Sequence, residues 1–316
     1  MAMALGWCVL ALVLLALGGD SVLKGASGVA RRLGWSPFVT GLLLVAFGTS
    51  IPELAVNARA FFTGSQNLAL GNAIGSNIVN FGLTLGLAAI VAPLVVQWRA
   101  LAPLLACLVA ATIALMVLGF DGVLTRLEGA AFVLAFALVL AWTLWRGRTE
   151  HPEVRQELSD YLATTDVPWR NVVRLLVGGV ALYFGAVWLV EHAPVVGMQW
   201  GLSPLLTGLL IVAIATALPE AAAAIGAARR GGGDIVVGHV VGSSVFNLLL
   251  VVGGMAAHRD LPIPASFVRF ELPAALAATL VLYPMLRKDL QISRAEGTVL
   301  FLGFLAWVVA EVMWSR

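Results

Sequence analysis

Charged residues and cysteines are both scarce in this chain, and each scarcity excludes a class of protein. Only 11% of the 316 residues are Asp, Glu, Lys or Arg, and 60% are hydrophobic. A soluble domain carries about 25% charged residues, so the composition excludes an ordinary soluble globular protein. Cys8 and Cys107 both lie within apolar runs, which excludes a disulfide framework and leaves too few ligands for a cysteine-based metal centre. We predict no cofactor and no nucleic-acid partner.

The chain does contain a series of continuous apolar runs of about 20 residues, the length that a helix needs to cross a bilayer. Continuous runs, rather than alternating ones, argue against a β-barrel. We interpret the first run as a retained span, because it lacks a basic leader and a clear cleavage site. The prediction is an all-α polytopic membrane protein with ten transmembrane helices, over residues 3–23, 37–62, 67–95, 100–119, 127–145, 171–191, 204–228, 233–256, 266–286 and 297–314.

One long polar segment divides these spans into two five-helix halves. This segment, residues 146–170, is rich in charged side chains. It would form a cytoplasmic linker between a first half at 1–145 and a second half at 171–316. With ten spans, one membrane face collects 14 of the 19 Lys and Arg residues, and such an excess marks the cytoplasmic side. Both termini are then extracytoplasmic, in a multi-pass protein of a prokaryotic inner cell membrane.

Residues 36–80 are repeated without a gap at 203–247, at a constant offset of 167. The copies are identical at 18 of 45 positions, and most of the shared residues are polar, Gly or Pro. Hydrophobic composition alone would match Leu with Val, but it would not align Thr, Pro, Glu, Ser and Asn. Five crossings separate the copies, so the second is inverted in the membrane relative to the first. Two inverted repeats with polar residues at membrane depth are typical of a secondary transporter.

Each copy carries a glutamate directly after a proline. Gly-Thr-Ser-Ile-Pro-Glu at 48–53 corresponds to Ala-Thr-Ala-Leu-Pro-Glu at 215–220. Proline removes one backbone hydrogen bond from a helix. A carbonyl left unpaired in hydrocarbon needs another partner, and a cation can provide it. We therefore expect a loosened backbone near Ala46 and Ala213, close to both glutamates.

A second shared segment adds hydroxyl and amide groups. Residues 71–80 read Gly-Asn-Ala-Ile-Gly-Ser-Asn-Ile-Val-Asn, and residues 238–247 read Gly-His-Val-Val-Gly-Ser-Ser-Val-Phe-Asn. Its Gly-x-x-x-Gly pattern alone is equally typical of closely packed membrane helices. The Ser and Asn that follow are four residues apart and share one helix face in each copy. With the two glutamates they form a set of hard oxygen donors, which favours alkali or alkaline-earth cations and especially Ca²⁺.

The two glutamates, Glu53 and Glu220, together balance the charge of one Ca²⁺. Without a cation, two carboxylates would face each other in a medium of low dielectric constant, which is costly. A carrier that changes sides only when this charge is compensated must exchange one cation load for another. The charges therefore favour obligatory antiport over uniport, without naming the counter-ion.

The chain resembles the sodium/calcium exchangers of the cation/calcium antiporter superfamily. Their two repeats carry Gly-Thr-Ser-x-Pro-Glu followed by Gly-Asn-x-x-Gly-Ser-Asn-x-x-Asn/Asp. The resemblance implies that Glu53 and Glu220 bind Ca²⁺ jointly at mid-membrane, with oxygens from Thr49 and Thr216. It implies that flanking Na⁺ positions or the central position are completed by Ser50, Ser76, Ser243, Asn80, Asn247 and the carbonyl groups of Ala46 and Ala213. The implied function is voltage-sensitive exchange of Ca²⁺ for Na⁺ by alternating access.

The second copy departs from the family pattern at four positions, the first of which is Ala215 in place of Gly. Ala217 stands where Ser is usual, so one hydroxyl ligand is missing, and His239 and Ser244 each replace an Asn. The missing ligand leaves the Na⁺ stoichiometry open. His239 motivates the alternative of an H⁺-coupled Ca²⁺ or cation antiporter, although a lone His beside Gly is more often a packing residue. Asn247 disfavours K⁺ dependence, since K⁺-dependent members tend to carry Asp there.

Two further classes compete with an antiporter. A membrane-embedded enzyme could use the two glutamates as acid and base, but no His-Glu-x-x-His, Gly-x-Ser-x-Gly or paired-Asp motif accompanies them. We therefore predict that the protein is not an enzyme. A passive cation channel would need no counter-ion and would conduct far above carrier rates.

Overall fold

The protein is an all-α polytopic membrane protein. The computed structural model describes residues 1–33, 50–96, 98–146 and 167–314. Within those ranges, nine helical segments are long and apolar enough to cross a membrane. The expected span at 37–62 is described only from residue 50 onward, so Ala46 and Thr49 lie outside the described residues.

The helical elements follow the expected spans closely. In chain order they are α1 (Ala2–Arg32), α3 (Ile51–Phe62), α4 (Gln66–Val79), η2 (Asn80–Leu85), α5 (Gly86–Val91), α6 (Trp98–Leu118), η3 (Gly119–Asp121), α7 (Arg126–Arg146), α9 (Pro168–Gln199), α10 (Pro204–Leu206), η5 (Thr207–Val212), α11 (Ala213–Arg229), α12 (Gly233–Val245), η6 (Phe246–Val252), α13 (Gly253–His258), η7 (Phe267–Glu271), α14 (Leu272–Asp289) and α15 (Arg294–Trp314). The first helix after the expected linker starts at Pro168, because proline suits the first turn of a helix, and residues 147–166 lie outside the described ranges.

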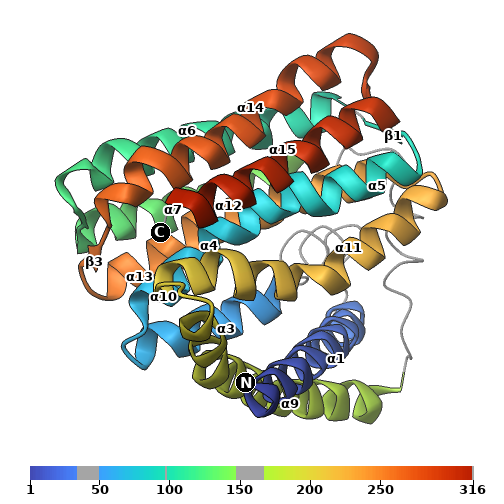
Figure 1. The fold of residues 1–316 in the computed structure, drawn as a ribbon. Coiled ribbons are helices and arrows are strands. Elements are labelled where there is room, and N and C mark those ends of the chain that lie inside the picture. The colour runs from blue at the N-terminus through green and yellow to red at the C-terminus, as the bar shows by residue number, and fades with distance from the viewer. Residues whose placement is uncertain (34–49, 97, 147–166, 315–316) are drawn as a thin grey trace.

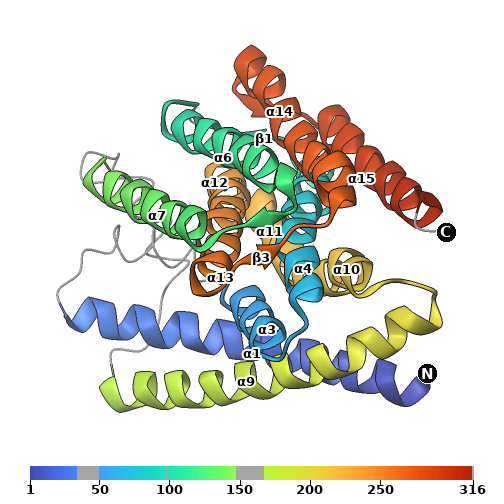
Figure 2. The same cartoon turned by 90° about the vertical axis from the view of Figure 1, so that its left-hand side faces the viewer.

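The helices form three layers (Figures 1 and 2). In Figure 2, α1 and α9 make one layer, α3, α4 and α10 to α13 make the middle layer, and α6, α7, α14 and α15 make the third. The middle layer is the most enclosed, since 78% of the best apolar window in Gln66–Val91 and 83% of that in Gly233–His258 are buried. Both of these segments contain the polar motifs. The layers therefore bury the motifs and leave the outer helices to face lipid.

The layer of α1 and α9 gives direct evidence for inversion of the repeats. A Cβ atom added to Gly18 would lie 2.9 Å from the carbonyl oxygen of Gly178, and one added to Gly185 would lie 2.9 Å from that of Ala11. Gly18 and Gly185 are 167 residues apart, and so are Ala11 and Gly178. The two approaches are thus the same contact seen from each repeat. The first helices of the two halves run antiparallel where they cross.

This close crossing predicts a sharp difference between two adjacent glycines. We expect Gly178→Val to destabilise the protein by about 1–3 kcal/mol, because the new Cβ would meet the Gly18 carbonyl oxygen at 2.8 Å. Gly179→Val is the matched control, since a Cβ there meets nothing within 4 Å. Thermal unfolding of both variants in detergent provides the measurement. Equal midpoints for the two variants would contradict the crossing.

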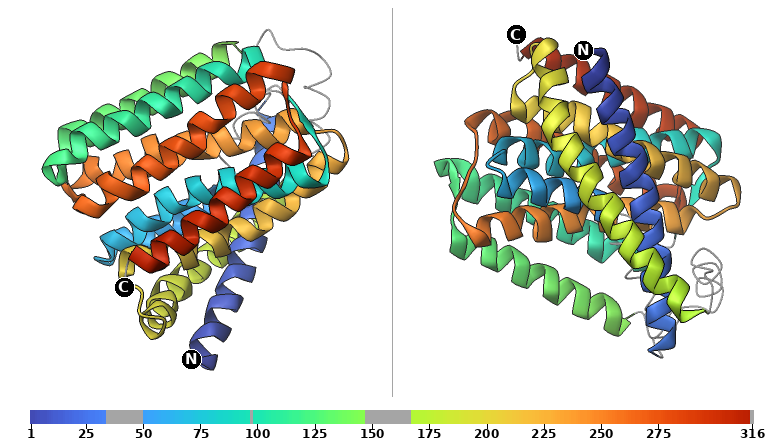
Figure 3. Two further views of the ribbon diagram at one scale, coloured as in Figure 1. Left: turned by 45° about the horizontal axis from the view of Figure 1, so that its top comes forward. Right: turned by 90° about the horizontal axis from the view of Figure 1, so that it is seen from below.

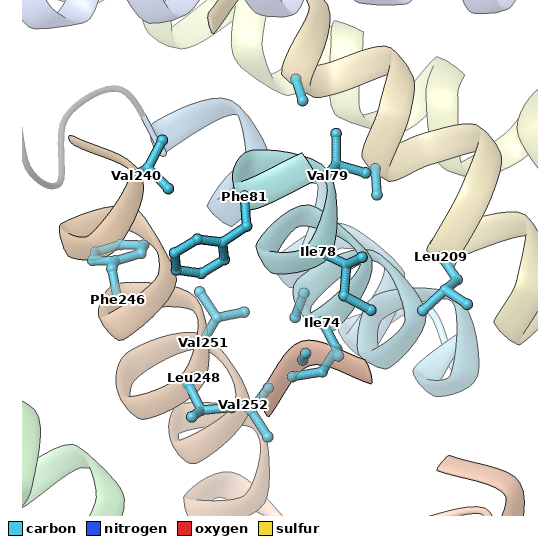
Figure 4. Close-up of a cluster of buried hydrophobic side chains, with 14 of the residues drawn as sticks. Ile74, Ile78, Val79, Phe81, Leu209, Val240, Phe246, Leu248, Val251 and Val252 are labelled. Atoms are coloured by element: carbon cyan, nitrogen blue, oxygen red, sulfur yellow. The ribbon is translucent and has the colours of Figure 1, made fainter. Parts of the chain in front are cut away.

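In the middle layer, the third helix of each half packs against its counterpart. Figure 4 shows Phe81 of η2 pointing toward Phe246 and Val251 of η6. Both η2 and η6 are π-helical, and with the offset of 167 they cover almost the same repeat positions, starting at or just before Asn80 and Asn247. π-Helical turns often occur at functional sites. The repeats therefore share a backbone irregularity that hydrophobic patterning did not predict.

Short strands join the two halves at two places and extend the duplication beyond the motifs. β1 (Leu94–Val95) pairs antiparallel with β4 (Gln291–Ile292), and β2 (Val123–Leu124) pairs antiparallel with β3 (Leu261–Pro262). β1 and β3 are 167 residues apart, whereas β2 and β4 are 168 apart. The two pairs are therefore equivalent under the repeat, although the sequence alone showed the duplication only over 36–80 and 203–247. The N-terminal end of α1 and the C-terminal end of α15 lie on the same side of the molecule, as an even number of crossings requires (Figure 3).

Candidate functional site

Two glutamates from opposite repeats lie close to each other in the middle layer, and little of either side chain is exposed. Glu53 lies in the first turn of α3 and is 1% exposed, and the side chain of Glu220 in α11 is 9% exposed. Their carboxyl groups lie close enough for the charge on Glu53 to act on Glu220. Thr216 of the second repeat also faces the Glu53 carboxylate. The structure thus brings together the two acidic residues that the sequence singles out.

A proline directly precedes each carboxylate, but its place in the helix differs between the two copies. Pro52 lies in the first turn of α3, where helices tolerate proline and where free N–H groups favour a negative charge. Pro219 lies inside α11, one residue before Glu220. The π-helical segment η5 ends directly before Ala213, so the backbone there departs from regular α-helix. The backbone is thus irregular directly before Ala213, as expected, but Pro219 is not the cause, because α11 stays α-helical through the proline.

Hydroxyl and amide groups of both repeats form a buried network beside the carboxylates. The Ser50 and Ser243 hydroxyl oxygens are 2.6 Å apart and share a hydrogen bond. The Asn80 amide donates to the Ser243 hydroxyl at 3.4 Å. On the other side, the Asn247 amide donates to Oδ1 of Asn77 at 3.2 Å. The network joins the third helices of the two repeats at their crossing.

Asn77 belongs to this network, although repeat identity did not select it as a site residue. Its amide donates to the backbone carbonyl of Ser244 at 3.3 Å, and Ser244 is its own repeat equivalent. Residues 167 apart that bond to each other must lie beside the pseudo-twofold axis. The two copies differ at this position, so a search for identical residues passes over it. Its place in the Gly-Ser-Asn motif of the first copy was the available signal.

Several oxygens of the site have no hydrogen-bond partner among the described residues. They are Oε1 and Oε2 of Glu53, Oε1 of Glu220, Oγ of Ser76 and the Oδ1 atoms of Asn80 and Asn247. A buried polar atom without a partner costs about 1–3 kcal/mol, and such atoms are rare in native proteins. Several buried oxygens without hydrogen-bond partners at one place could together coordinate a cation that has lost its water. The described residues contain no group of three or more His, Cys, Asp or Glu side chains, which agrees with a carboxylate pair completed by neutral oxygens.

Of the remaining candidate residues, Thr216 and Ala213 are described by the structure. Thr216 is buried, and its hydroxyl donates to the carbonyls of Val212 at 3.0 Å and Ala213 at 3.3 Å, which leaves its oxygen lone pairs free to accept. Ala213 and Ala217 are fully buried. Thr49 and Ala46, which the resemblance also implies, lie outside the described residues.

The glycine motif of the first copy has a packing role. A Cβ on Gly71 or Gly75 would overlap the backbone carbonyl of Leu205 or Leu209. These contacts press α4 against α10 and η5, which bring the second repeat toward the first. Gly238 of the second copy has no such neighbour among the described residues.

His239 lies at the edge of the site. Its Nε2 atom is 3.9 Å from Oε1 of Glu220, and both side chains are 9% exposed. Its repeat equivalent, Asn72, donates instead to Oδ1 of Asn57 at 2.8 Å, one turn beyond Glu53. The two halves of the site therefore differ in what surrounds each carboxylate.

An all-α membrane protein in which inverted repeats meet at buried carboxylates has the construction of a secondary cation transporter. The chain belongs to the sodium/calcium exchanger family, because the family profile described as sodium/calcium exchanger protein matches residues 3–145 and 170–313. Members of this family are ion exchangers rather than enzymes, and they act on transported ions without a separate cofactor. The chain is thus a multi-pass membrane antiporter of the cation/Ca²⁺ type.

Relatives of known name agree over nearly the whole length. The putative antiporter CaxA of Alkalimonas amylolytica is 35% identical, with 94% of each chain covered. The sodium/calcium exchanger MaX1 of Methanosarcina acetivorans is 30% identical, with 95% of this chain and 96% of the relative covered. A solved structure of the sodium-calcium exchanger NCX_Mj, soaked with Na⁺ and Sr²⁺, superposes with a TM-score of 0.69 at 27% identity, over 98% of this chain and 99% of that chain.

Proposed function

We propose that the protein exchanges Ca²⁺ for Na⁺ across the membrane by alternating access, with the ions bound between the two repeats. The observation that carries this proposal is the buried pair Glu53 and Glu220, contributed by opposite repeats and surrounded by orphan oxygens. Among the described residues, the basic group beside this pair is the imidazole of His239, which lies next to Glu220. A single imidazole cannot neutralise both carboxylates. A divalent cation compensates both charges at once. The names of MaX1 and NCX_Mj, both sodium/calcium exchangers, support the same ion pair.

The proposed ion-binding residues are those of the two motifs. Glu53 and Glu220 hold Ca²⁺, and neutral oxygens complete the coordination of Ca²⁺ and Na⁺. Carboxylates, amide oxygens, hydroxyls and carbonyls are the ligand types that Ca²⁺ takes in proteins. The neutral ligands proposed are Thr49, Thr216, Ser50, Ser76, Ser243, Asn80, Asn247 and the carbonyls of Ala46 and Ala213.

We further propose that the protein lies in the inner cell membrane with both termini extracytoplasmic. The excess of Lys and Arg on one face supports this orientation. The proposed organisation is two five-helix halves, at 1–145 and 171–316, joined by a cytoplasmic linker at 146–170. The equivalence of the strand pairs β1–β4 and β2–β3 supports the two halves.

The test is radiolabelled Ca²⁺ uptake into proteoliposomes loaded with Na⁺. We expect uptake to follow an outward Na⁺ gradient, to stop when Na⁺ is equal on both sides, and to need no pH gradient. Uptake that ignores the Na⁺ gradient would eliminate the proposal. A conductance far above carrier rates, without any counter-ion, would instead identify a channel.

A proton-coupled antiporter is the second candidate. Ala217 removes one hydroxyl that a Na⁺ ion could use, and the His239 imidazole lies 3.9 Å from the Glu220 carboxylate. The same vesicles distinguish the two functions. An outward proton gradient in Na⁺-free medium should drive Ca²⁺ uptake only if protons are the counter-ion.

A further inference from the structure

The two repeats do not provide equivalent hydroxyl positions beside the carboxylates. In one half of the site, Ser50 of the first repeat and Ser243 of the second lie with their oxygens 2.6 Å apart. At the offset of 167, Ser50 corresponds to Ala217 and Ser243 corresponds to Ser76. A methyl group therefore stands where the matching hydroxyl would be, and Ala217 is fully buried. The duplication left one hydroxyl pair where a symmetric protein would have two.

The amides of the site are unequal in the same sense. Asn80 donates to Ser243 at 3.4 Å, and its equivalent, Asn247, would donate to Ser76 in a symmetric protein. Asn247 instead donates to Asn77 at 3.2 Å. Asn80 has no equivalent amide oxygen to donate to, because the repeat equivalent of Asn77 is Ser244. The hydroxyl of that serine donates to the Val240 carbonyl at 2.8 Å, within its own helix.

Both differences remove partners from the same atom. The Ser76 hydroxyl is 1% exposed and has no hydrogen-bond partner in the described part of the chain. The Ser243 hydroxyl, by contrast, has two partners. With Ser243 donating to Ser50 and accepting from Asn80, each of the two hydroxyl oxygens keeps one lone pair that can turn toward a small cation. Ser76 offers a single oxygen beside a methyl group.

We propose that this asymmetry limits the protein to two Na⁺ ions per Ca²⁺, so that exchange is electroneutral. One Na⁺ binds at the Ser50–Ser243 hydroxyl pair, and the second occupies the position of Ca²⁺ between the two carboxylates. The side formed by Ala217 and Ser76 holds no third ion. Two Na⁺ or one Ca²⁺ each neutralise Glu53 and Glu220, so exchange at this ratio moves no net charge. The proposal rests on the proposed Na⁺/Ca²⁺ exchange.

Electroneutrality is tested by the Ca²⁺ accumulation ratio at equilibrium. Proteoliposomes are given a fixed Na⁺ gradient and a K⁺ diffusion potential set with valinomycin. With two Na⁺ per Ca²⁺, the ratio should stay the same at zero potential and at about 100 mV of either sign. With three Na⁺, one net charge would move per cycle, and about 100 mV would change the ratio by about 50-fold. The Na⁺ dependence of Ca²⁺ efflux should have a Hill coefficient no greater than about two.

The residue responsible is tested by restoring the missing hydroxyl. In the variant Ala217→Ser, a hydroxyl faces Ser76 again, as Ser50 faces Ser243. We expect its Ca²⁺ ratio to become dependent on the membrane potential, toward the 50-fold change. Ala228→Ser is the matched control, a buried alanine of the same helix about three turns beyond Ala217, and its ratio should stay independent of potential.

Each result has a distinct meaning. A wild-type ratio that changes about 50-fold with about 100 mV overturns the two-Na⁺ count. An Ala217→Ser variant that transports Ca²⁺ but stays independent of potential overturns the assignment to Ala217. Absence of any Na⁺-driven Ca²⁺ accumulation by the wild-type protein refutes the exchange function itself, and it is seen at zero potential before the count is measured.

Discussion

Replacing Glu53 with Gln should abolish Na⁺-driven Ca²⁺ uptake, down to the rate of vesicles without protein. Glutamine has nearly the same shape and keeps one oxygen, but it removes one of the two charges that balance Ca²⁺. A single carboxylate leaves a net positive charge on the loaded site, in a region where both glutamates are removed from water. The same reasoning applies to Glu220→Gln. Initial rates of radiolabelled Ca²⁺ uptake provide the measurement.

The control for this charge removal is Glu191→Gln. Glu191 lies on α9 with an exposed side chain, outside the repeat motifs. This variant should transport at the wild-type rate. Retention of uptake by Glu53→Gln, at a protein level equal to that of the control, would show that the paired carboxylates do not hold the transported ion.

Replacing Asn77 with Leu should lower both stability and transport more than any other neutral substitution in the network. Leucine has a similar shape but makes neither of the two hydrogen bonds of Asn77. The change leaves the Ser244 carbonyl and the Asn247 amide without these partners in the middle of the protein. At about 1–3 kcal/mol for each unsatisfied group, we expect a loss of about 2–5 kcal/mol. Such a loss should lower the unfolding midpoint in detergent by about 5–15 °C.

The repeat equivalent of Asn77 supplies its control. The Ser244 hydroxyl donates only to the Val240 carbonyl one turn earlier, and Ser244→Ala keeps the backbone carbonyl that Asn77 uses. We expect its unfolding midpoint to stay within about 1 °C of the wild-type value, since a hydroxyl bonded back to its own helix contributes little. Asn77→Asp keeps the oxygen that accepts from Asn247 and should lose less stability than Asn77→Leu. Similar midpoints for Asn77→Leu and Ser244→Ala would show that position 77 does not connect the repeats.

The sequence predicted the class of fold because apolar runs long enough to cross a bilayer are read directly from composition. The expected spans agree with the described helices within a few residues at most ends, although α1 and α9 extend further than expected, to 31 and 32 residues. Hydropathy underestimates them because it detects only the part that crosses hydrocarbon. Inversion of the repeats followed from an odd number of crossings. The antiparallel contacts between Gly18 and Gly178 and between Ala11 and Gly185 confirm it.

The sequence did not predict the π-helical segments, the strand pairs or the bonds of Asn77. A π-helical turn changes the hydrogen-bond register without changing hydropathy, so η2 and η6 look like ordinary apolar helix in the sequence. The two-residue strands are too short to show an alternating pattern, and their partners are distant in the chain. Asn77 differs between the copies and therefore carries no repeat signal.

By itself, the sequence determined that this is a membrane protein of two related halves with one repeat-matched glutamate in each. These features depend on composition, on local spacing and on comparison of the chain with itself. Only the tertiary structure decided how the differences between the two copies change the bonding of the site: Ser50 and Ser243 bond to each other, and the Ser76 hydroxyl has no partner among the described residues. The physical reason is that a hydrogen bond depends on distance and direction between helices. A single difference, such as Ala217 for Ser or Ser244 for Asn, therefore changes the partners of residues more than 140 positions away in the chain.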